Sequence, residues 1–179
     1  LPEHLTDICR EINKGKYDLG IVVDPDVDRL AFISEDGNPF GEEYTLVAVA
    51  DYVLTAGKNK KGNTVSNLSS TRALRDITES SGGQYFAAAV GEVNVVTKMK
   101  ECGAVIGGEG NGGIIYPDLH YGRDALVGIA LFLSHLAKSE TTVSRLRAKY
   151  PNYIISKNKI ELTPAIDLEI VLQAVNEKP

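Results

Sequence analysis

Apolar and polar residues follow two different periods along the chain, and the two periods alternate between about residues 40 and 150. A spacing of three to four positions between apolar residues predicts helices at residues 42–56, 71–81, 93–101, 124–137 and 142–149. Short apolar runs between them predict strands at residues 64–70, 84–90, 104–108 and 113–116. This alternation predicts an α/β fold, a layered domain with a mostly parallel mixed sheet flanked by helices.

The two ends of the chain follow other patterns. A helix is predicted at residues 2–14, and the continuous apolar run "DLGIVV" at 18–23 predicts a strand of a parallel sheet, buried on both faces. The run "LAFIS" at 30–34 predicts another strand, so the first forty residues resemble the end of a preceding domain. Near the C-terminus, Thr163 followed by Pro164 predicts the cap and first turn of a closing helix.

Composition narrows the class of protein. The 179 residues are 43% hydrophobic, carry a formal net charge of -5 and contain no basic run beyond Lys58–Lys61, which argues against a nucleic-acid binder. No apolar run approaches the roughly 20 residues of a membrane span. Cys9 and Cys102 are far apart and form no CxxC motif. An acidic chain with this cysteine usage and no signal pattern predicts a cytoplasmic protein with reduced thiols.

Three aspartates stand on alternate residues between the apolar runs 18–23 and 30–34. In an extended loop, residues i, i+2 and i+4 point the same way, so the side chains of Asp24, Asp26 and Asp28 are expected to converge. Carboxylates that close repel one another unless a cation lies among them. Hard oxygen ligands favour Mg²⁺ or Ca²⁺. We therefore predict a metal site at this loop.

Arg29 follows the third aspartate directly. A guanidinium beside a bound cation is expected only where an anion also binds, and Arg suits a phosphate. An EF-hand loop would match the aspartate spacing, but Arg29 stands where its glycine belongs and "LAFIS" follows. A dehalogenase-type phosphatase would also need a Thr or Ser and a Lys at matching sites, and no convincing set is found.

A second unusual stretch, "GGEGNGG" at residues 107–113, contains five glycines in seven residues. The strand-like "IIYP" follows it, whereas a dinucleotide-binding loop would be followed by a helix. The loop would instead present Glu109 and Asn111 on one side. A carboxylate next to an amide suits the hydroxyl groups of a sugar.

Together, these loops resemble those of the α-D-phosphohexomutase family, which includes phosphoglucomutases, phosphomannomutases and phosphoglucosamine mutases. "DPDVDR" resembles the family's Mg²⁺ loop, "GGEGNGG" its sugar-recognition loop, and "VGEVNVV" a loop that helps to bind substrate. The resemblance implies that Asp24, Asp26 and Asp28 bind Mg²⁺ and that Arg29 lies near the phosphate. It implies a substrate-binding role for four further residues: Gly91, Glu92, Glu109 and Asn111.

The resemblance also divides the chain. Residues 1–39 would be the C-terminal part of domain II with the metal loop, residues 40–157 domain III with the sugar loop, and residues 158–179 a linker and helix towards domain IV. The family's phosphoserine motif, of the T-A-S-H-N-P type, and its fourth-domain phosphate loop are not found. The chain is therefore expected to be a fragment that is inactive alone, with domains I and IV as its partners.

For the whole enzyme, the resemblance implies interconversion of hexose 1-phosphate and hexose 6-phosphate through a phosphoserine and a bisphosphorylated sugar. The alternatives are a non-catalytic Ca²⁺- or sugar-binding module and, third, a dehalogenase-type phosphatase. In "PDLHYGRD", His120 could face the cleft or be structural. Arg123 and Asp124 are interpreted mainly as the start of the helix at 124–137.

Overall fold

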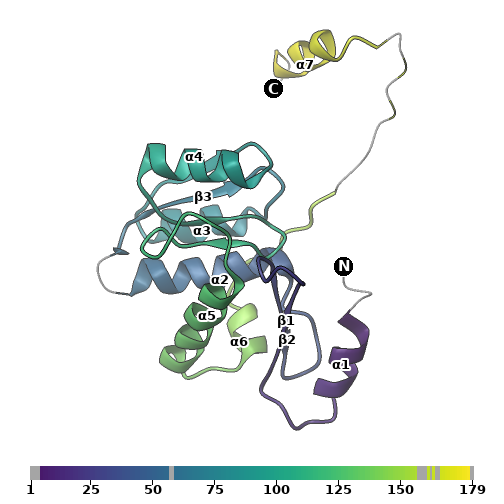
Figure 1. Ribbon diagram of the computed structural model, residues 1–179, viewed down its shortest axis with the longest axis vertical. Helices are drawn as coiled ribbons and strands as arrows, with labels where there is room; N and C mark the ends of the chain where they lie inside the picture. The colour runs from purple at the N-terminus through teal and green to yellow at the C-terminus, as the bar shows by residue number, and fades with distance from the viewer. Residues whose placement is uncertain (1–4, 57–58, 157–160, 162, 164–165, 178–179) are drawn as a thin grey trace.

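The computed structural model describes residues 5–56, 59–156, 161, 163 and 166–177, and Figure 1 shows the path of the chain. A four-stranded sheet lies at its centre, with the strand order β4-β3-β5-β6. Strand β3 pairs in parallel with β4 and β5, whereas β6 is antiparallel to β5. The strands are β3 (Asn63–Asn67), β4 (Tyr85–Ala88), β5 (Ala104–Gly108) and β6 (Ile114–Ile115). The predicted α/β fold with a mostly parallel sheet is confirmed.

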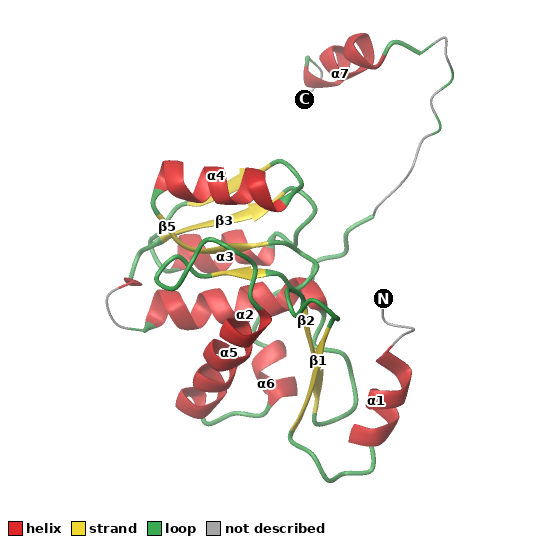
Figure 2. Cartoon of the chain, viewed as in Figure 1, coloured by secondary structure: helices red, strands yellow, loops and turns green. Residues whose placement is uncertain are grey.

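Helices cover both faces of this sheet (Figure 2). Helix α4 (Glu92–Cys102) packs on one face, and α2 (Glu42–Thr55) and α3 (Ala73–Ser80) pack on the other. Helix α5 (Ala125–Ser139) packs against α2 and also contacts β6, and the short α6 (Val143–Arg147) contacts α2. Within the described ranges, none of the helices combines the length and the apolar character needed to cross a bilayer.

Two apolar clusters fill the space between these layers. The smaller one lies under α4 and includes Val65, Val95 and Met99. In the larger one, Phe32 and Phe132 stack with their ring centroids 3.8 Å apart. Phe32 belongs to the N-terminal hairpin and Phe132 to α5, so burial of these rings fixes the hairpin on the α/β domain.

The N-terminal part consists of α1 (Thr6–Ile12) and a hairpin of β1 (Leu19–Val23) with β2 (Leu30–Ser34). The two strands are antiparallel, so the prediction of a buried parallel strand at 18–23 was wrong. Ile21 and Val23 are 39% and 40% exposed. The connection at 24–29 is too short for a crossover between parallel strands, which takes a dozen or more residues, and this length dictates a hairpin.

The C-terminal helix α7 (Leu168–Asn176) begins later than the sequence predicted. Its cap is Asp167, whose side chain accepts hydrogen bonds from the backbone N–H groups of Glu169 and Ile170. Thr163 is therefore not the cap, and Pro164 lies outside the described residues. Asp is among the strongest N-cap residues, which explains why the helix begins there.

Candidate functional site

The aspartate loop, residues 24–29, is a tight turn and not the extended segment that the sequence predicted. The backbone N–H of Val27 donates to the carbonyl of Asp24 at 3.1 Å. Val27 has φ of +56°, a conformation that is unusual for a β-branched residue. The turn still brings the three aspartates together, since one carboxylate oxygen from each lies within 4.8 Å of the others.

Backbone donors hold Asp24 in its ionised form. Its Oδ1 accepts hydrogen bonds from the backbone N–H of Asp28 at 3.2 Å and of Arg29 at 3.0 Å. Burial acts to raise the pKa of Asp24, but these backbone donors outweigh it and leave the pKa below its ordinary value. The Asp24 carboxylate is therefore ionised over the whole neutral range of pH.

Asp28 is held differently. Its Oδ2 forms an ion pair with Arg123, whereas its Oδ1 is buried and has no hydrogen-bond partner among the residues that the structure describes. Burial raises the pKa of Asp28, and the charges of Asp24 and Asp26 act in the same direction, although Arg123 opposes them. A buried oxygen without a partner is costly, and a cation would satisfy it. The donor set, three carboxylates and no nitrogen or sulfur, fits Mg²⁺.

Arg29 lies on the open side of this loop. Its Nε is 3.6 Å from Oδ2 of Asp24 and 3.7 Å from Oδ1 of Asp28, and about half of its side chain is exposed. These separations are too long for strong hydrogen bonds. The guanidinium therefore remains able to bind an anion next to the three carboxylates.

The glycine loop, residues 107–113, turns the chain from β5 into β6. Gly112 has φ of +86°, and a Cβ atom added there would lie 2.1 Å from the carbonyl oxygen of Leu30. Only glycine fits where this loop crosses the start of β2. The crossing brings the glycine loop close to the aspartate loop.

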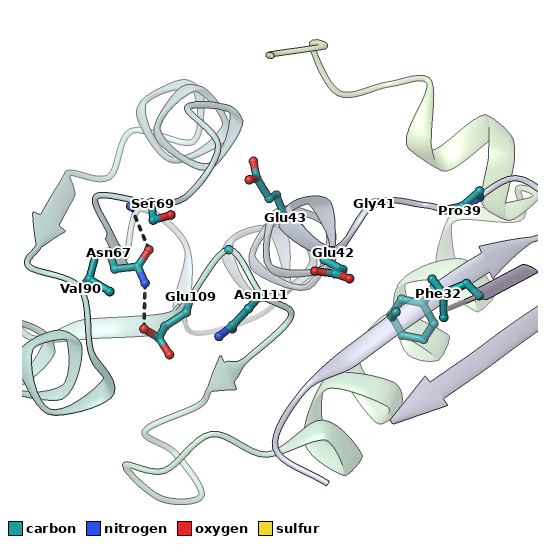
Figure 3. A pocket seen from close by; sticks show the side chains of 13 residues that line it. Phe32, Pro39, Gly41, Glu42, Glu43, Asn67, Ser69, Val90, Glu109 and Asn111 are labelled. Carbon is teal, nitrogen blue, oxygen red and sulfur yellow. Dashed lines mark hydrogen bonds between the residues drawn. The ribbon is translucent and has the colours of Figure 1, made fainter. Parts of the chain in front are cut away.

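Glu109 is only 5% exposed, so it does not project freely from the glycine loop. Its Oε1 accepts a hydrogen bond from the amide of Asn67 at 2.8 Å (Figure 3). Its Oε2 accepts one from Nη1 of Arg123 at 3.1 Å. Asn67 stands at the end of β3, next to β5. The sequence analysis did not single it out, although a polar residue at the carboxyl end of a buried parallel strand is a usable signal.

Gly91 and Glu92 lie at the start of α4. Gly91 adopts φ of +115° and ψ of 136° immediately before the helix. The carboxylate of Glu92 accepts hydrogen bonds from Arg123, at 3.3 Å from its backbone N–H and at 3.0 Å from its Nε. The Glu92 carboxylate thus faces Arg123. Neither Gly91 nor Glu92 lines the two pockets described below.

Arg123 connects the predicted site residues. Its side chain is 15% exposed and pairs with Asp28, Glu92 and Glu109. The interpretation of Arg123 as mainly a helix start was too narrow, whereas Asp124 does cap α5 by accepting from the backbone N–H of Val127. No local pattern could have identified Arg123, because its partners are 14, 31 and, for Asp28, 95 positions away.

His120 belongs to the same segment but has local contacts. Its Nε2 lies 3.0 Å from Oδ2 of Asp124, and its Nδ1 accepts from the backbone N–H of Gly122 at 3.1 Å. These contacts support the cap of α5. They favour the structural interpretation of His120.

Two adjoining pockets open between the hairpin and the α/β domain. One has a volume of about 360 Å³ and is lined by Glu109, Asn111 and Asn67, with Glu42 and Glu43 at the start of α2 (Figure 3). The other, of about 320 Å³, is lined by Asp24 and Arg29. Both are lined by Leu5, Ala31, Glu42 and Asn111. The glycine loop and the aspartate loop therefore face neighbouring parts of one cleft.

Residues 41–153 match the family model described as "Phosphoglucomutase/phosphomannomutase, alpha/beta/alpha domain III". The chain belongs to the phosphoglucomutase/phosphomannomutase family. This membership confirms the resemblance to the phosphohexomutases. It favours that family over the dehalogenase-type phosphatase.

Relatives of this family member match most of its length. A probable phosphoglucosamine mutase of Methanopyrus kandleri is 30% identical over 170 residues, which is 95% of this chain and 37% of that protein. A phosphoglucomutase/phosphomannomutase of Thermococcus kodakarensis is 35% identical over 157 residues, 88% of this chain and 34% of that protein. The chain thus spans about a third of the length of these curated relatives.

A solved structure supports the same assignment. The phosphoglucomutase/phosphomannomutase family protein of Burkholderia thailandensis superposes with a TM-score of 0.76 at 28% identity, covering 86% of this chain and 33% of that one. A putative phosphomannomutase of Thermus thermophilus, at 22% identity and the same TM-score, agrees in fold.

Proposed function

We propose that this chain provides the metal-binding and sugar-recognition part of a phosphohexomutase that interconverts hexose 1-phosphate and hexose 6-phosphate. The observation that carries the proposal is the pair of adjoining pockets. Asp24 and Arg29 line one of them, Glu109 lines the other, and Asn111 lines both. A phosphoryl group at the aspartate loop would thus lie in the pocket next to the one that Glu109 lines, with Asn111 at their border.

The proposal includes a division of the whole protein. Residues 1–39 would end a second domain and residues 40–157 would form a third one, with 158–179 leading to a fourth. The serine that carries the phosphoryl group in the family's reaction would belong to another part of the protein. The purified chain alone is therefore expected not to turn over glucose 1-phosphate. Measurable turnover would contradict the proposal that the serine belongs to another part of the protein.

Mg²⁺ is the metal that we propose for Asp24, Asp26 and Asp28. When bound, it would neutralise negative charge on the transferring phosphoryl group. Arg29 would grip the oxygens of the same group, because its guanidinium is exposed beside the carboxylates. These residues supply positioning and charge neutralisation, which account for most of the catalysis of phosphoryl transfer.

Sugar recognition would rest on Asn111 and Glu109, with Gly91 and Glu92 supporting that side of the cleft. The side-chain Oδ1 of Asn111 accepts the backbone N–H of Gly113 at 3.2 Å, which fixes the side chain at the border of the two pockets. Its amide would donate to a hydroxyl, and Glu109 would accept from one. The candidate substrates are the phosphates of glucose, mannose and glucosamine.

The metal assignment is tested by titrating the chain with MgCl₂ in a calorimeter. Asp26 is the exposed member of the three carboxylates, so Asp26→Asn is expected to leave the fold intact and to abolish the Mg²⁺ isotherm. Asp36→Asn is the matched control, since Asp36 is an exposed aspartate in the turn after β2 whose Oδ1 accepts the backbone N–H of Asn38. An isotherm unchanged by Asp26→Asn would refute the assignment.

Sugar recognition is tested separately by nuclear magnetic resonance on the Mg²⁺-loaded chain. Glucose 1-phosphate, mannose 1-phosphate and glucosamine 1-phosphate are each expected to shift the amide signals of the glycine loop. Asn111→Ala should weaken these shifts and leave Mg²⁺ affinity unchanged. If the sugar phosphates shift only the amide signals of the aspartate loop, the proposed role of the glycine loop is contradicted.

A further inference from the structure

We propose that Arg123 is a positioning residue that orients Asp28 towards the metal and ties the aspartate loop to Glu109 and Glu92. The proposal rests on the proposed metal site and extends it to a residue outside both loops. Arg123 touches neither of the two pockets. It would therefore act through the side chains that it holds.

The guanidinium of Arg123 uses a different nitrogen for each of its three carboxylate partners. Nη2 pairs with Oδ2 of Asp28, Nε donates to Oε2 of Glu92 at 3.0 Å, and Nη1 donates to Oε2 of Glu109 at 3.1 Å. The three partners come from the β1–β2 turn, the start of α4 and the glycine loop directly after β5. One planar side chain thus fixes three separate segments around itself.

The two oxygens of the Asp28 carboxylate have different environments. Oδ2 is paired with Arg123, and Oδ1 is buried with no hydrogen-bond partner in the described part of the chain. Asp28 cannot rotate its carboxylate without breaking the pair with Arg123. The pair therefore keeps Oδ1 available as the metal ligand, as hydrogen-bonded partners do for ligating carboxylates in metal sites.

A second link joins the same two segments. The backbone N–H of Ala125 donates to the carbonyl of Val27 at 3.1 Å, two residues from Arg123 and within the aspartate loop. Val27 is the residue held at φ of +56°. The start of α5 thus fixes both the backbone of the turn and the side chain of Asp28, which is what a positioning role requires.

The first experiment compares Mg²⁺ affinity by calorimetry in the parent chain, Arg123→Lys and Arg123→Gln. Positioning predicts that both variants bind Mg²⁺ about 10–100-fold more weakly, because Lys keeps the charge but lacks the planar fork. A purely electrostatic role predicts the opposite pattern. Arg123→Lys would then match the parent, and Arg123→Gln would bind the cation more tightly because a nearby positive charge is gone.

Arg147→Lys is the matched control for a loss of structural hydrogen bonds. Nε of Arg147 donates to the carbonyl of Phe40 at 2.9 Å, and its Nη2 donates to Oδ1 of Asn152 at 2.8 Å, away from the aspartate loop. This variant is expected to lose some stability to urea with no change in Mg²⁺ affinity. An equal loss of affinity in Arg147→Lys would show that the Arg123 effect is only general destabilisation, and would overturn the proposal.

The second experiment needs no variant and so remains decisive if the Arg123 variants do not fold. During Mg²⁺ titration of the parent chain, the Nε–H signal of Arg123 and the amide signals of Glu92 and Glu109 are expected to shift along with those of Asp24–Arg29. Shifts confined to the aspartate loop would overturn the role of Arg123 and leave the metal site intact. Absence of any Mg²⁺-dependent shift would instead refute the metal site itself, and the inference with it.

Discussion

The side-chain amide of Asn67 donates a hydrogen bond to Oε1 of Glu109 at 2.8 Å, and this bond joins the end of β3 to the glycine loop (Figure 3). Both residues are buried, at 4% and 5% exposure. The amide oxygen of Asn67, Oδ1, accepts from the backbone N–H of Ser69 and from the hydroxyl of Ser70. Asn67 thus holds the carboxylate of Glu109 and the loop after β3 in a fixed relation.

Asn67→Asp removes the donor of this bond. The variant keeps an acceptor for Ser69 and Ser70 but places a second carboxylate against Glu109 in a buried site. We expect a loss of about 1–3 kcal/mol in the free energy of unfolding, measured in urea. Adding Glu109→Gln should restore much of it, since the new amide can donate to the introduced carboxylate and its oxygen can still accept from Arg123. The stability lost in the double variant should be smaller than the sum of the losses in Asn67→Asp and Glu109→Gln measured separately. A loss equal to that sum or larger would contradict this account.

Gly112→Ala tests the close approach of the glycine loop to β2. The new methyl group would lie 2.1 Å from the carbonyl oxygen of Leu30, in addition to the unfavourable φ of +86°. Gly15→Ala is the matched control, since Gly15 has φ of +75° but no atom of the described residues within 4 Å of the added Cβ. Gly15→Ala should cost about 1–2 kcal/mol of stability in urea, from conformation alone. Gly112→Ala should cost about 1–3 kcal/mol more; equal losses would refute the steric account.

Much of the fold could be predicted because local periodicity decides it. The helices at 42–56, 93–101 and 124–137 follow the spacing of apolar residues, and Asp124 has the cap role that its residue type suggests. The run at 18–23 misled the prediction, because an apolar run alone does not distinguish a parallel strand from an antiparallel one. The length of the following loop was the better guide.

The candidate site could be predicted only as far as it is local. The aspartates at 24, 26 and 28 lie together, but a turn with Val27 at positive φ brings them there, and residue spacing does not encode that turn. The contact between Arg123 and Asp28 could not be predicted, because the two residues are 95 positions apart and meet only where the hairpin packs on the domain. Long-range ion pairs result from tertiary packing, so a single sequence shows the two charged residues but not that they are in contact.

Glu35 provides a prediction for pH. Its carboxylate accepts from the backbone N–H and the hydroxyl of Ser144, which joins the end of the hairpin to the start of α6. Burial acts to raise the pKa of Glu35, but the hydrogen bonds from Ser144 and Thr142 outweigh it and lower the pKa from 4.5 to about 2. A lowered folded-state pKa means that this contribution to stability is present above about pH 4.5 and is lost as the pH falls towards 2.

Glu35→Gln is therefore expected to be less stable than the parent at neutral pH. The gap should narrow from about pH 4.5 down towards pH 2, because over this range the carboxylate is protonated in the unfolded parent but still ionised in the folded one. Urea unfolding of both proteins at several pH values measures the gap. A gap that stays constant from neutral to acid pH would show that Glu35 contributes through packing and not through its charge.

Tyr150→Phe tests the buried polar contact between α2 and the segment after α6. The Tyr150 hydroxyl donates to Oδ2 of Asp51 at 2.9 Å, and His135 Nε2 lies 3.3 Å from the same oxygen. Burial acts to raise the pKa of Asp51, yet the hydrogen bonds from His135 and Tyr150 outweigh it and keep the pKa lowered. Removing the hydroxyl leaves this carboxylate one donor short, so we expect a loss of about 1–3 kcal/mol in the free energy of unfolding.

Tyr153→Phe is the control for this loss, because it removes the same atom from a hydrogen bond at the surface. The Tyr153 hydroxyl donates to Oδ2 of Asp76 at 2.6 Å, and Tyr153 is 38% exposed. In the variant, water can hydrogen-bond to the Asp76 carboxylate in place of the lost hydroxyl, so the free energy of unfolding should stay close to that of the parent. If the two variants lose equal stability, burial of the Asp51 carboxylate is not what makes the Tyr150 hydrogen bond important.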